Sequence, residues 1–239
     1  MFDPNSDLGS ATWRDAEPAQ WAEEPPWWSE KERSRPLFWP RGAKWFTNDP
    51  LGPVPHSHPD ASEVFVVATG AMSLQVGRQL VEAQAGDFIH IPPDTYHEPL
   101  SNHGEDLCLL ALISPNWRDL RWKTENFVPS DYEGVATVVS LREPGAQLPS
   151  DERIYSEVVH LAGGAGDSFA GRPEADTLVY AMNNPIDVSV HGLAGTLHAG
   201  QYTHVMAGSQ FSVAAPAGCE TRVLIIQAID PKWKGDPDV

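Results

Sequence analysis

The chain repeats a pattern of short apolar segments at a fixed offset, and this repeat constrains the fold more than any other feature. The stretch HPDASEVFVVATG (58–70) aligns with RPEADTLVYAMNN (172–184), an offset of 172 − 58 = 114 residues. Carried forward without a gap, the same offset aligns three further positions: Ala85 with Ala199, Gly86 with Gly200, and Ile91 with Val205. Because one offset serves both stretches, the sequence predicts a duplicated folding unit.

The repeated segments are typical of β-strands. Runs such as FVVAT, DFIHIP and RVLIIQAI are rich in β-branched and aromatic residues, and Gly, Pro, Asn and Asp separate them at hairpin spacing. No long stretch carries apolar residues at the helical period. The sequence therefore predicts an all-β protein.

The composition along the chain suggests five segments. The first carries four tryptophans, which is too much apolar surface for a purely solvated tail, so we expect it to fold back onto the domain or onto a neighbouring subunit. The predicted segments are an N-terminal arm (1–36), a first β unit (37–142), a linker (143–153), a second β unit (154–230) and a tail (231–239).

The charge of the chain excludes two classes of partner. Sixteen Lys and Arg residues against 33 Asp and Glu residues give a net charge of −17, which repels nucleic acid and anionic membrane surfaces. The N-terminal sequence has no basic segment followed by an apolar one, and no later apolar run is long enough to cross a bilayer. We expect a cytoplasmic protein whose partner is a small molecule.

Two stretches concentrate residues that can bind a metal ion. PHSHPDASEVFVVATG places His56 and His58 one residue apart, a spacing that puts both on one face of a strand, and a short turn would return Glu63 to that face. GDFIHIPPDTYH adds His97 after a Pro-Pro-Asp turn. Together they offer three imidazoles and one carboxylate, whereas the two cysteines have no spacing typical of a thiolate site.

This set of donors narrows the choice of metal without deciding it. Imidazole and carboxylate donors suit Fe(II), Mn(II), Co(II), Ni(II) or Zn(II). Four protein ligands around a six-coordinate ion leave two positions for water, substrate or dioxygen, so the pattern indicates an open site rather than a closed structural one.

The two stretches resemble the two sequence motifs of the cupin family. The first has two histidines separated by one residue, then a glutamate, and a glycine seven positions after it; the second has Asp94 where the family usually has a glycine in the turn. The resemblance implies a double cupin, with two small β-barrels or jelly rolls in one chain. It also implies a metal-binding first barrel whose ligands are His56, His58, Glu63 and His97, and one divalent metal per chain, with Fe(II) favoured. The departure at Asp94 concerns the geometry of the turn.

The repeat then predicts that the second barrel binds no metal. At the offset of 114, none of the four corresponding residues replaces a histidine or glutamate: Ala170, Arg172, Thr177 and Phe211. We expect a structural role for this barrel, covering sheet edges and burying apolar surface. The alternative is a second small-molecule site with Arg172 as an anion clamp.

Other residues are candidates for roles around the metal. His90 alternates with Phe88 along DFIHIP and could face the cavity as an acid or base, or be a hydrogen-bonded core or surface histidine. Trp39 and Trp45 precede the first motif and could line the mouth of the site for a flat or apolar substrate, or pack in the core. We therefore take Phe88, Trp39 and Trp45 as candidate substrate-binding residues.

A basic segment follows the second motif in an otherwise acidic chain. SPNWRDLRWKTENF (114–127) contains Arg118, Arg121 and Lys123. These residues could attract a substrate carboxylate or form surface ion pairs, and the second reading is the simpler one.

Three functions are compatible with such a site. The first is an Fe(II) dioxygenase that chelates its substrate at the metal. The second is a lyase, isomerase or cyclase that uses the metal as a Lewis acid, needs no oxygen and tolerates zinc. The third is a non-catalytic binding protein, which the complete ligand set disfavours. The resemblance and the tryptophan-bearing arm also suggest a homodimer.

Overall fold

The computed structural model is all-β, as the sequence predicts. It describes residues 39–45, 56–59, 61–104, 107–114, 121–122, 136–163, 168–170, 175–190, 192–205 and 209–228. The predicted arm (1–36) and tail (231–239) lie outside these residues. Every regular element of the described part is a β-strand, and this part divides between Asp151 and Glu152 into two compact units, each built from two β-sheets. Within it, no helix has the length and apolarity needed to cross a bilayer.

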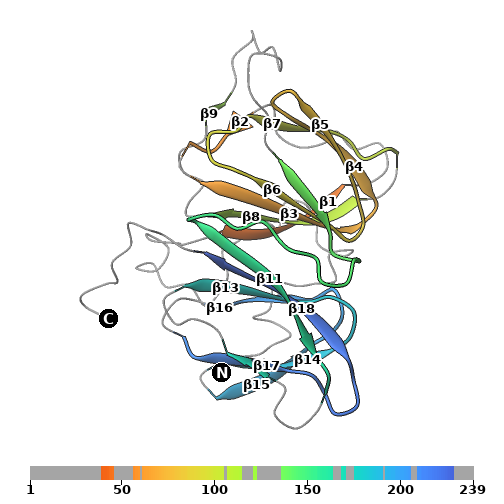
Figure 1. Ribbon diagram of the computed structural model, residues 1–239, viewed down its shortest axis with the longest axis vertical. Coiled ribbons are helices and arrows are strands. Elements are labelled where there is room, and N and C mark those ends of the chain that lie inside the picture. The colour runs from red at the N-terminus through yellow and green to blue at the C-terminus, as the bar shows by residue number, and fades with distance from the viewer. Residues whose placement is uncertain are drawn as a thin grey trace, which may run out of the picture. The chain divides into compact units, whose positions relative to one another are not determined.

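The first barrel consists of two five-stranded sheets, seen as facing layers in Figure 1. One sheet has the order β1 (Trp39–Trp45), β8 (Leu107–Ser114), β3 (Ser62–Thr69), β6 (Asp87–Ile91) and β10 (Thr137–Ser140). The other has the order β5 (Gln79–Gln84), β4 (Ala71–Val76), β7 (His97–Ser101), β2 (His56–Ser57) and β9 (Arg121–Trp122). Neighbouring strands pair in antiparallel fashion.

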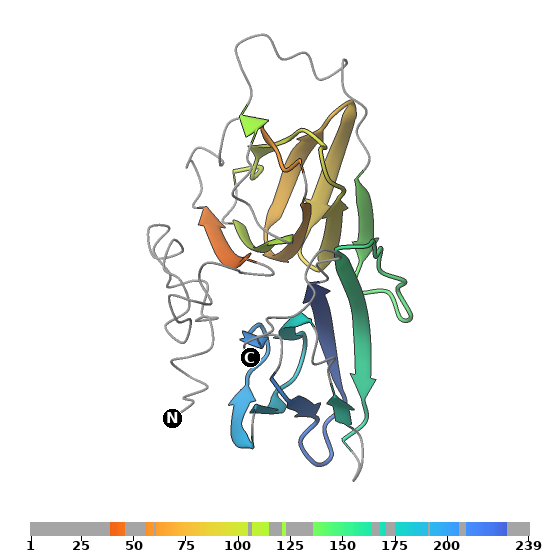
Figure 2. The same cartoon turned by 90° about the vertical axis from the view of Figure 1, so that its left-hand side faces the viewer.

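The second barrel repeats this plan with two four-stranded sheets. One has the order β11 (Ile154–Leu161), β18 (Thr221–Ala228), β13 (Asp176–Ala181) and β16 (Tyr202–Val205). The other has the order β12 (Ser168–Ala170), β17 (Phe211–Ala214), β14 (Ile186–Val190) and β15 (Leu193–Leu197). Figure 2 shows the two layers of this barrel in the side view.

The strand register reproduces the predicted offset. Glu63 lies across from Ile91 and from Ile113 in the first barrel. Thr177 lies across from Val205 and from Gln227 in the second. The differences are 177 − 63, 205 − 91 and 227 − 113, and each equals 114. A backbone register that agrees on three strands is stronger support for the duplication than aligned residue types.

The offset does not hold at β12. His56 lies across from His97, so an ungapped offset would place Ala170 across from Phe211. Ala170 instead lies across from Ser212, which is a shift of one residue. Ala170 is therefore not the structural counterpart of His56, and Arg172 lies outside the described residues.

Each barrel encloses its own apolar core. In the first barrel the core includes Phe65 and Val67, which alternate with Glu63 on β3. In the second barrel it includes Val179 and Ala181, which alternate with Thr177 on β13. Since alternate residues of a strand share a face, Glu63 and Thr177 lie on the interior faces of their barrels.

Candidate metal centre

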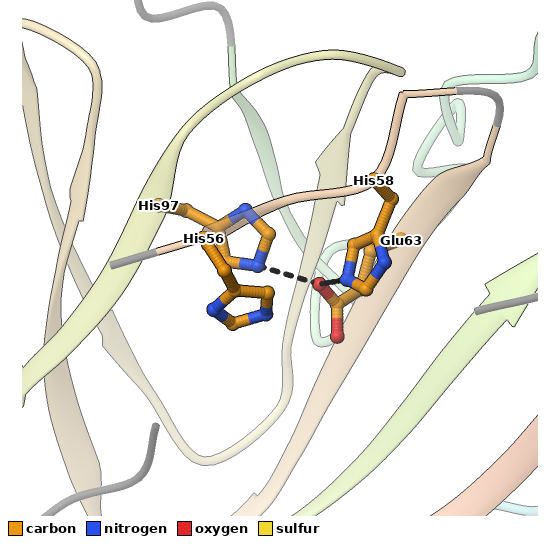
Figure 3. A group of neighbouring side chains, drawn as sticks. All are labelled: His56, His58, Glu63 and His97. Atoms are coloured by element: carbon orange, nitrogen blue, oxygen red, sulfur yellow. Dashed lines mark ion pairs between the residues drawn. The ribbon is translucent and has the colours of Figure 1, made fainter. Parts of the chain in front are cut away.

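Four side chains from three strands and one turn meet inside the first barrel. His56 lies on β2, His58 directly after it, Glu63 on β3 and His97 at the start of β7. One ligand atom of each lies within 4.8 Å of those of the others, and all four residues are buried. Figure 3 shows their polar ends converging on one place. Among the described residues this is the group of His, Cys, Asp and Glu side chains that could hold a metal ion.

The two sheets of the barrel each contribute to the group. His56 and His97 lie directly across from each other in the β2–β7 ladder, and their ring centroids are 4.3 Å apart. Glu63 comes from β3 in the opposite sheet. Pro59 lies in the turn that connects the two sheets and reverses the chain between His58 and Glu63. The sequence spacing predicts that these side chains lie close together, because the apolar residues of the same strands determine which face of each strand is interior.

The backbone determines which nitrogen of His97 faces the group. His97 Nδ1 lies 3.0 Å from the carbonyl oxygen of Thr95, which can only accept a hydrogen bond. Nδ1 therefore carries the proton and donates, and a neutral His97 presents the lone pair of Nε2 to the interior. This is the arrangement that metal-binding histidines use to orient their ring.

The carboxylate of Glu63 lies against two histidine nitrogens without forming hydrogen bonds. Glu63 Oε2 is 2.7 Å from His97 Nε2 and 3.2 Å from His58 Nε2. Neither contact has the angles of a hydrogen bond, so these three buried atoms lack hydrogen-bond partners within the described structure. Two lone pairs at 2.7 Å repel each other unless a proton or a metal cation lies between them. The unpaired atoms therefore fit a bound cation.

The same proximity changes the protonation of the group in the absence of a metal. Burial raises the pKa of Glu63, but the charge of His97 and the contacts with His58 and His97 outweigh it and hold this pKa well below its ordinary value. Burial lowers the pKa of His97, but the Glu63 carboxylate outweighs it and raises this pKa. A metal ion that binds Nε2 of His97 therefore competes with a proton there, as is usual for histidine ligands.

One turn supports two of the four side chains. The backbone N–H of Asp94 donates to the carbonyl oxygen of His58 at 2.8 Å, while the Thr95 carbonyl accepts from His97. Asp94 has φ = 55°, in the left-handed region where glycine is least strained and Asp is tolerated better than most residues. The family's usual glycine and the Asp of this chain thus meet the same geometric need.

The structure does not bring His90 or Phe88 to the group. His90 lies across from Val64, and Phe88 across from Val66, whereas Glu63 lies across from Ile91. Since successive strand residues point to opposite faces, His90 and Phe88 lie on the face of the sheet that points away from Glu63. The strand register therefore contradicts two predictions: that His90 acts as an acid or base in the interior, and that Phe88 binds the substrate there.

His90 instead belongs to a hydrogen-bonded cluster on that other face. His90 Nε2 lies 2.9 Å from Asp151 Oδ2, and Ser62 Oγ donates to the same oxygen at 2.6 Å. Asp151 lies near the C-terminal end of the predicted linker (143–153), so the two contacts attach this part of the linker to the first barrel. This matches the alternative of a hydrogen-bonded histidine.

The candidate tryptophans lie on the edge strand β1. Trp39 lies across from Ile113 and Trp45 across from Leu107. Their side chains lie outside what the structure describes, so their substrate-binding roles stay predictions. Arg118 and Lys123 of the basic segment also lie outside it.

Sequence reasoning missed the short strand β9. Arg121 and Trp122 pair with β2, and Trp122 lies directly across from His56. A strand of two residues is too short for a periodic pattern, and the sequence around it is marked by basic residues rather than by a strand pattern.

The second barrel has neutral residues at the corresponding interior positions. Thr177 corresponds to Glu63 and Phe211 to His97 by register. Gln227 Nε2 donates to Thr177 Oγ1 at 3.3 Å, and Thr177 Oγ1 donates to the Ala175 carbonyl at 3.3 Å. These residues satisfy one another and present no carboxylate.

The sequence matches one protein family over the first barrel. Residues 48–113 match the family model of the Cupin domain, and this stretch contains all four residues of the group. The resemblance to cupins is confirmed for this part of the chain. No curated protein matches the chain by sequence.

Solved structures share the fold over most of the chain. Protein Ylba from E. coli has a TM-score of 0.61 at 11% identity, covering 87% of this chain and 83% of that chain. AerE from Microcystis aeruginosa has a TM-score of 0.59 at 12% identity, covering 81% and 88%.

A salicylate 1,2-dioxygenase from Pseudaminobacter salicylatoxidans has a TM-score of 0.62 at 12% identity, covering 86% of this chain and 75% of that chain. A variant of that enzyme in complex with gentisate has a TM-score of 0.64 at 10% identity, covering 85% and 72%. At such identities these similarities show the fold and not the activity.

Proposed function

We propose that this chain is a metal-dependent cupin enzyme that acts on a small organic molecule, as an Fe(II) dioxygenase. The observation that carries the proposal is the buried group of three imidazoles and one carboxylate, in which Glu63 Oε2, His58 Nε2 and His97 Nε2 face one another without hydrogen-bond partners in the described structure. A purely structural cluster would pair these atoms with one another, because an unsatisfied buried polar atom costs about 1–3 kcal/mol.

In this proposal His56, His58, Glu63 and His97 hold the ion. Three neutral nitrogens and one carboxylate leave a divalent ion with a net positive charge, which favours a substrate that binds through an anionic oxygen. When bound, Fe(II) with two open positions supplies the one-electron chemistry that lets dioxygen react with an organic substrate.

The protein residues hold the site ready for that chemistry. The Thr95 carbonyl keeps the proton of His97 on Nδ1, so Nε2 stays available as a donor atom. Glu63 is 2% exposed and His97 is 1% exposed, so the group lies in a water-poor interior where charge interactions are strong. The hydrogen bond from Asp94 fixes the backbone of His58.

Among metals, we favour iron over manganese, nickel, cobalt or zinc, although all accept these donors. Support comes from the similar fold of a salicylate 1,2-dioxygenase and from the gentisate complex of its variant. We also propose that the second barrel is metal-free and structural, because Thr177 and Phe211 replace two of the donors. The homodimer and the cytoplasmic location stay predictions.

The test combines metal content with oxygen use. Purified protein is analysed for its metals, then loaded with Fe(II) without oxygen, and oxygen uptake is followed with gentisate, salicylate and catechol. His58→Ala removes one donor, and His198→Ala changes an exposed histidine of the second barrel as a matched control.

About one iron per chain, lost in His58→Ala and kept in His198→Ala, with oxygen uptake, supports the proposal. A chain that works with zinc, or that converts a substrate without oxygen, indicates the Lewis-acid alternative. Absence of metal binding in the wild-type chain contradicts the site itself.

A further inference from the structure

Three apolar side chains flank the candidate metal centre in the two sheets of the first barrel. Glu63 on β3 lies directly across from Ile91 on β6 and from Ile113 on β8. His97 on β7 lies directly across from Val76 on β4. Residues directly across from each other in antiparallel strands lie on one face of the sheet, so the three apolar side chains point into the interior beside the ligands. All three are buried.

An aromatic ring also borders the group. Phe65 is two residues from Glu63 on β3, so both side chains lie on the interior face of that strand. The rings of Phe65 and His97 meet edge to face, with their centroids 6.3 Å apart. Phe65 is buried and belongs to the apolar core of this barrel. A molecule bound at the group therefore has an aromatic surface close to it.

The cationic side chains are placed differently. In the described part of the first barrel the arginine side chains are those of Arg78 and Arg142, and both are exposed. Arg78 lies in the turn between β4 and β5, and Arg142 pairs with Asp87 at 3.1 Å. Burial of an anionic group without a cation beside it costs far more than burial of an apolar group. Neither of these arginines provides such a cation in the interior.

We propose that the substrate of this site has one anionic chelating head and an apolar body, and that the body lies against Phe65, Ile91 and Ile113. This inference rests on the proposed function, because the head needs a metal in the group. It narrows the substrate class, since sugars, amino acids and dicarboxylates carry further polar groups that the described interior leaves without partners. An aromatic body gains further from Phe65, because aromatic rings attract each other beyond their buried area.

The test uses three hydroxamates that share one chelating head and differ in the body. Acetohydroxamate has a methyl group, benzohydroxamate a phenyl ring, and succinic monohydroxamate a chain that ends in a carboxylate. The protein is loaded with Co(II), whose amount per chain is measured by elemental analysis, and the affinity for each hydroxamate is measured by absorption. Because the head is constant, the affinity ratios report the contacts of the body.

We expect the wild type to bind benzohydroxamate at least about tenfold more tightly than acetohydroxamate, because the phenyl ring buries more apolar area. Succinic monohydroxamate should bind at least about tenfold more weakly than acetohydroxamate, because its carboxylate is buried without a cation. Equal affinities for the three, or a preference for the charged body, would overturn the inference and leave the metal site intact. Absence of Co(II) binding would instead contradict the proposed function, and the inference with it.

A matched pair of variants tests where the body lies. Phe65→Leu removes the ring beside His97, and Phe88→Leu removes a buried ring on the opposite face of the neighbouring strand β6. In Phe65→Leu the ratio of benzohydroxamate to acetohydroxamate affinity should fall about two- to tenfold, the range of an aromatic contact. Phe88→Leu should keep the wild-type ratio.

A purely structural role of Phe65 predicts a different result. Loss of support for His97 would weaken both hydroxamates by the same factor and leave their ratio unchanged, and this would overturn the contact between the body and Phe65. If Phe65→Leu does not fold, the three affinities of the wild type still decide whether the substrate class is the one proposed.

Discussion

The two barrels share their strand order and most of their register, but they differ at the interior position of Glu63. The first barrel has Glu63 there, facing His58 and His97 without hydrogen bonds. The second has Thr177, which accepts from Gln227 and donates to the Ala175 carbonyl. The backbone thus accommodates either an unsatisfied charged group or a satisfied neutral pair at the same place.

This comparison separates what the fold provides from what the donor residues provide. The strands that position Glu63 also position Thr177, so the fold alone does not make a metal site. What distinguishes the first barrel is the set of donor atoms that lack partners inside the protein. The following predictions break or sharpen this comparison.

The largest effect is expected from removing the carboxylate. Glu63→Gln keeps the size of the side chain but removes its charge, and we expect the affinity for Fe(II) or Co(II) to fall by more than about 100-fold, beyond the usual loss for residues that merely support a ligand. Equilibrium dialysis measures this. Glu82→Gln, at an exposed glutamate of the same barrel, should bind metal as the wild type does. Equal affinities in the two variants would remove Glu63 from the site.

The next effect concerns the neutral pair of the second barrel. Thr177→Val leaves the buried Gln227 amide and the Ala175 carbonyl without their partner, so we expect a loss of about 1–3 kcal/mol in the free energy of unfolding. Metal content should stay unchanged. Adding Gln227→Leu should recover part of the loss, because both polar partners are then replaced. Denaturant unfolding tests this, and a loss of metal from Thr177→Val would mean that the second barrel contributes to binding.

A smaller effect is expected in the turn that supports two ligands. Asp94→Val places a β-branched residue at φ = 55°, which costs about 1–3 kcal/mol of strain. Part of this strain should move His58 and His97, and we expect the metal affinity to fall by about tenfold, as for other supporting residues. Asp94→Gly relieves the strain and should bind metal at least as well as the wild type. Equal affinities in Asp94→Val and Asp94→Gly would show that the turn does not position the ligands.

The smallest effect is the pH dependence of the metal-free protein. The lowered pKa of Glu63 stabilises the folded state at pH values above 4.5, the ordinary pKa of this group. This contribution is lost as the pH falls through the pKa of Glu63 in the folded protein. The raised pKa of His97 stabilises the folded state at pH values below 6.5, the ordinary pKa of this group. This contribution is lost as the pH rises through the pKa of His97 in the folded protein.

We therefore expect the melting temperature of the metal-free protein to fall as the pH rises above 6.5. The fall should vanish in the Co(II)-loaded protein, where the metal replaces the proton. Glu63→Gln, measured without metal, should also lack it. A fall of the same size in all three samples would locate the titration elsewhere in the protein.

The sequence predicted the fold and the group of donors because both depend on repeating, local patterns. The offset of 114 reappears in the pairing of Glu63 and of Thr177, since register follows the alternation of apolar residues. His56 and Glu63 meet because each lies on the interior face of its strand. Only the shift at Ala170 escaped an ungapped alignment, because a one-residue change at a short strand leaves no trace in residue types.

The sequence could not show which face of β6 is the interior one at His90. Phe88 and His90 lie on one face of β6, and Ile89 and Ile91 lie on the other. Both faces are largely apolar, and both are buried. A strand that is buried on both faces has no polar side to orient it. The pairing of Trp122 with His56 was also hidden, because it joins residues 66 positions apart (122 − 56) through a strand of two residues.

Anomalous diffraction at the iron edge tests the central claim most directly. Crystals are grown without oxygen from protein loaded with Fe(II). We predict one strong peak per chain, at about 2.0–2.2 Å from nitrogen atoms of His56, His58 and His97 and from a carboxylate oxygen of Glu63, the usual bond lengths for these donors. A peak in the second barrel, or no peak among these four residues, would contradict the account.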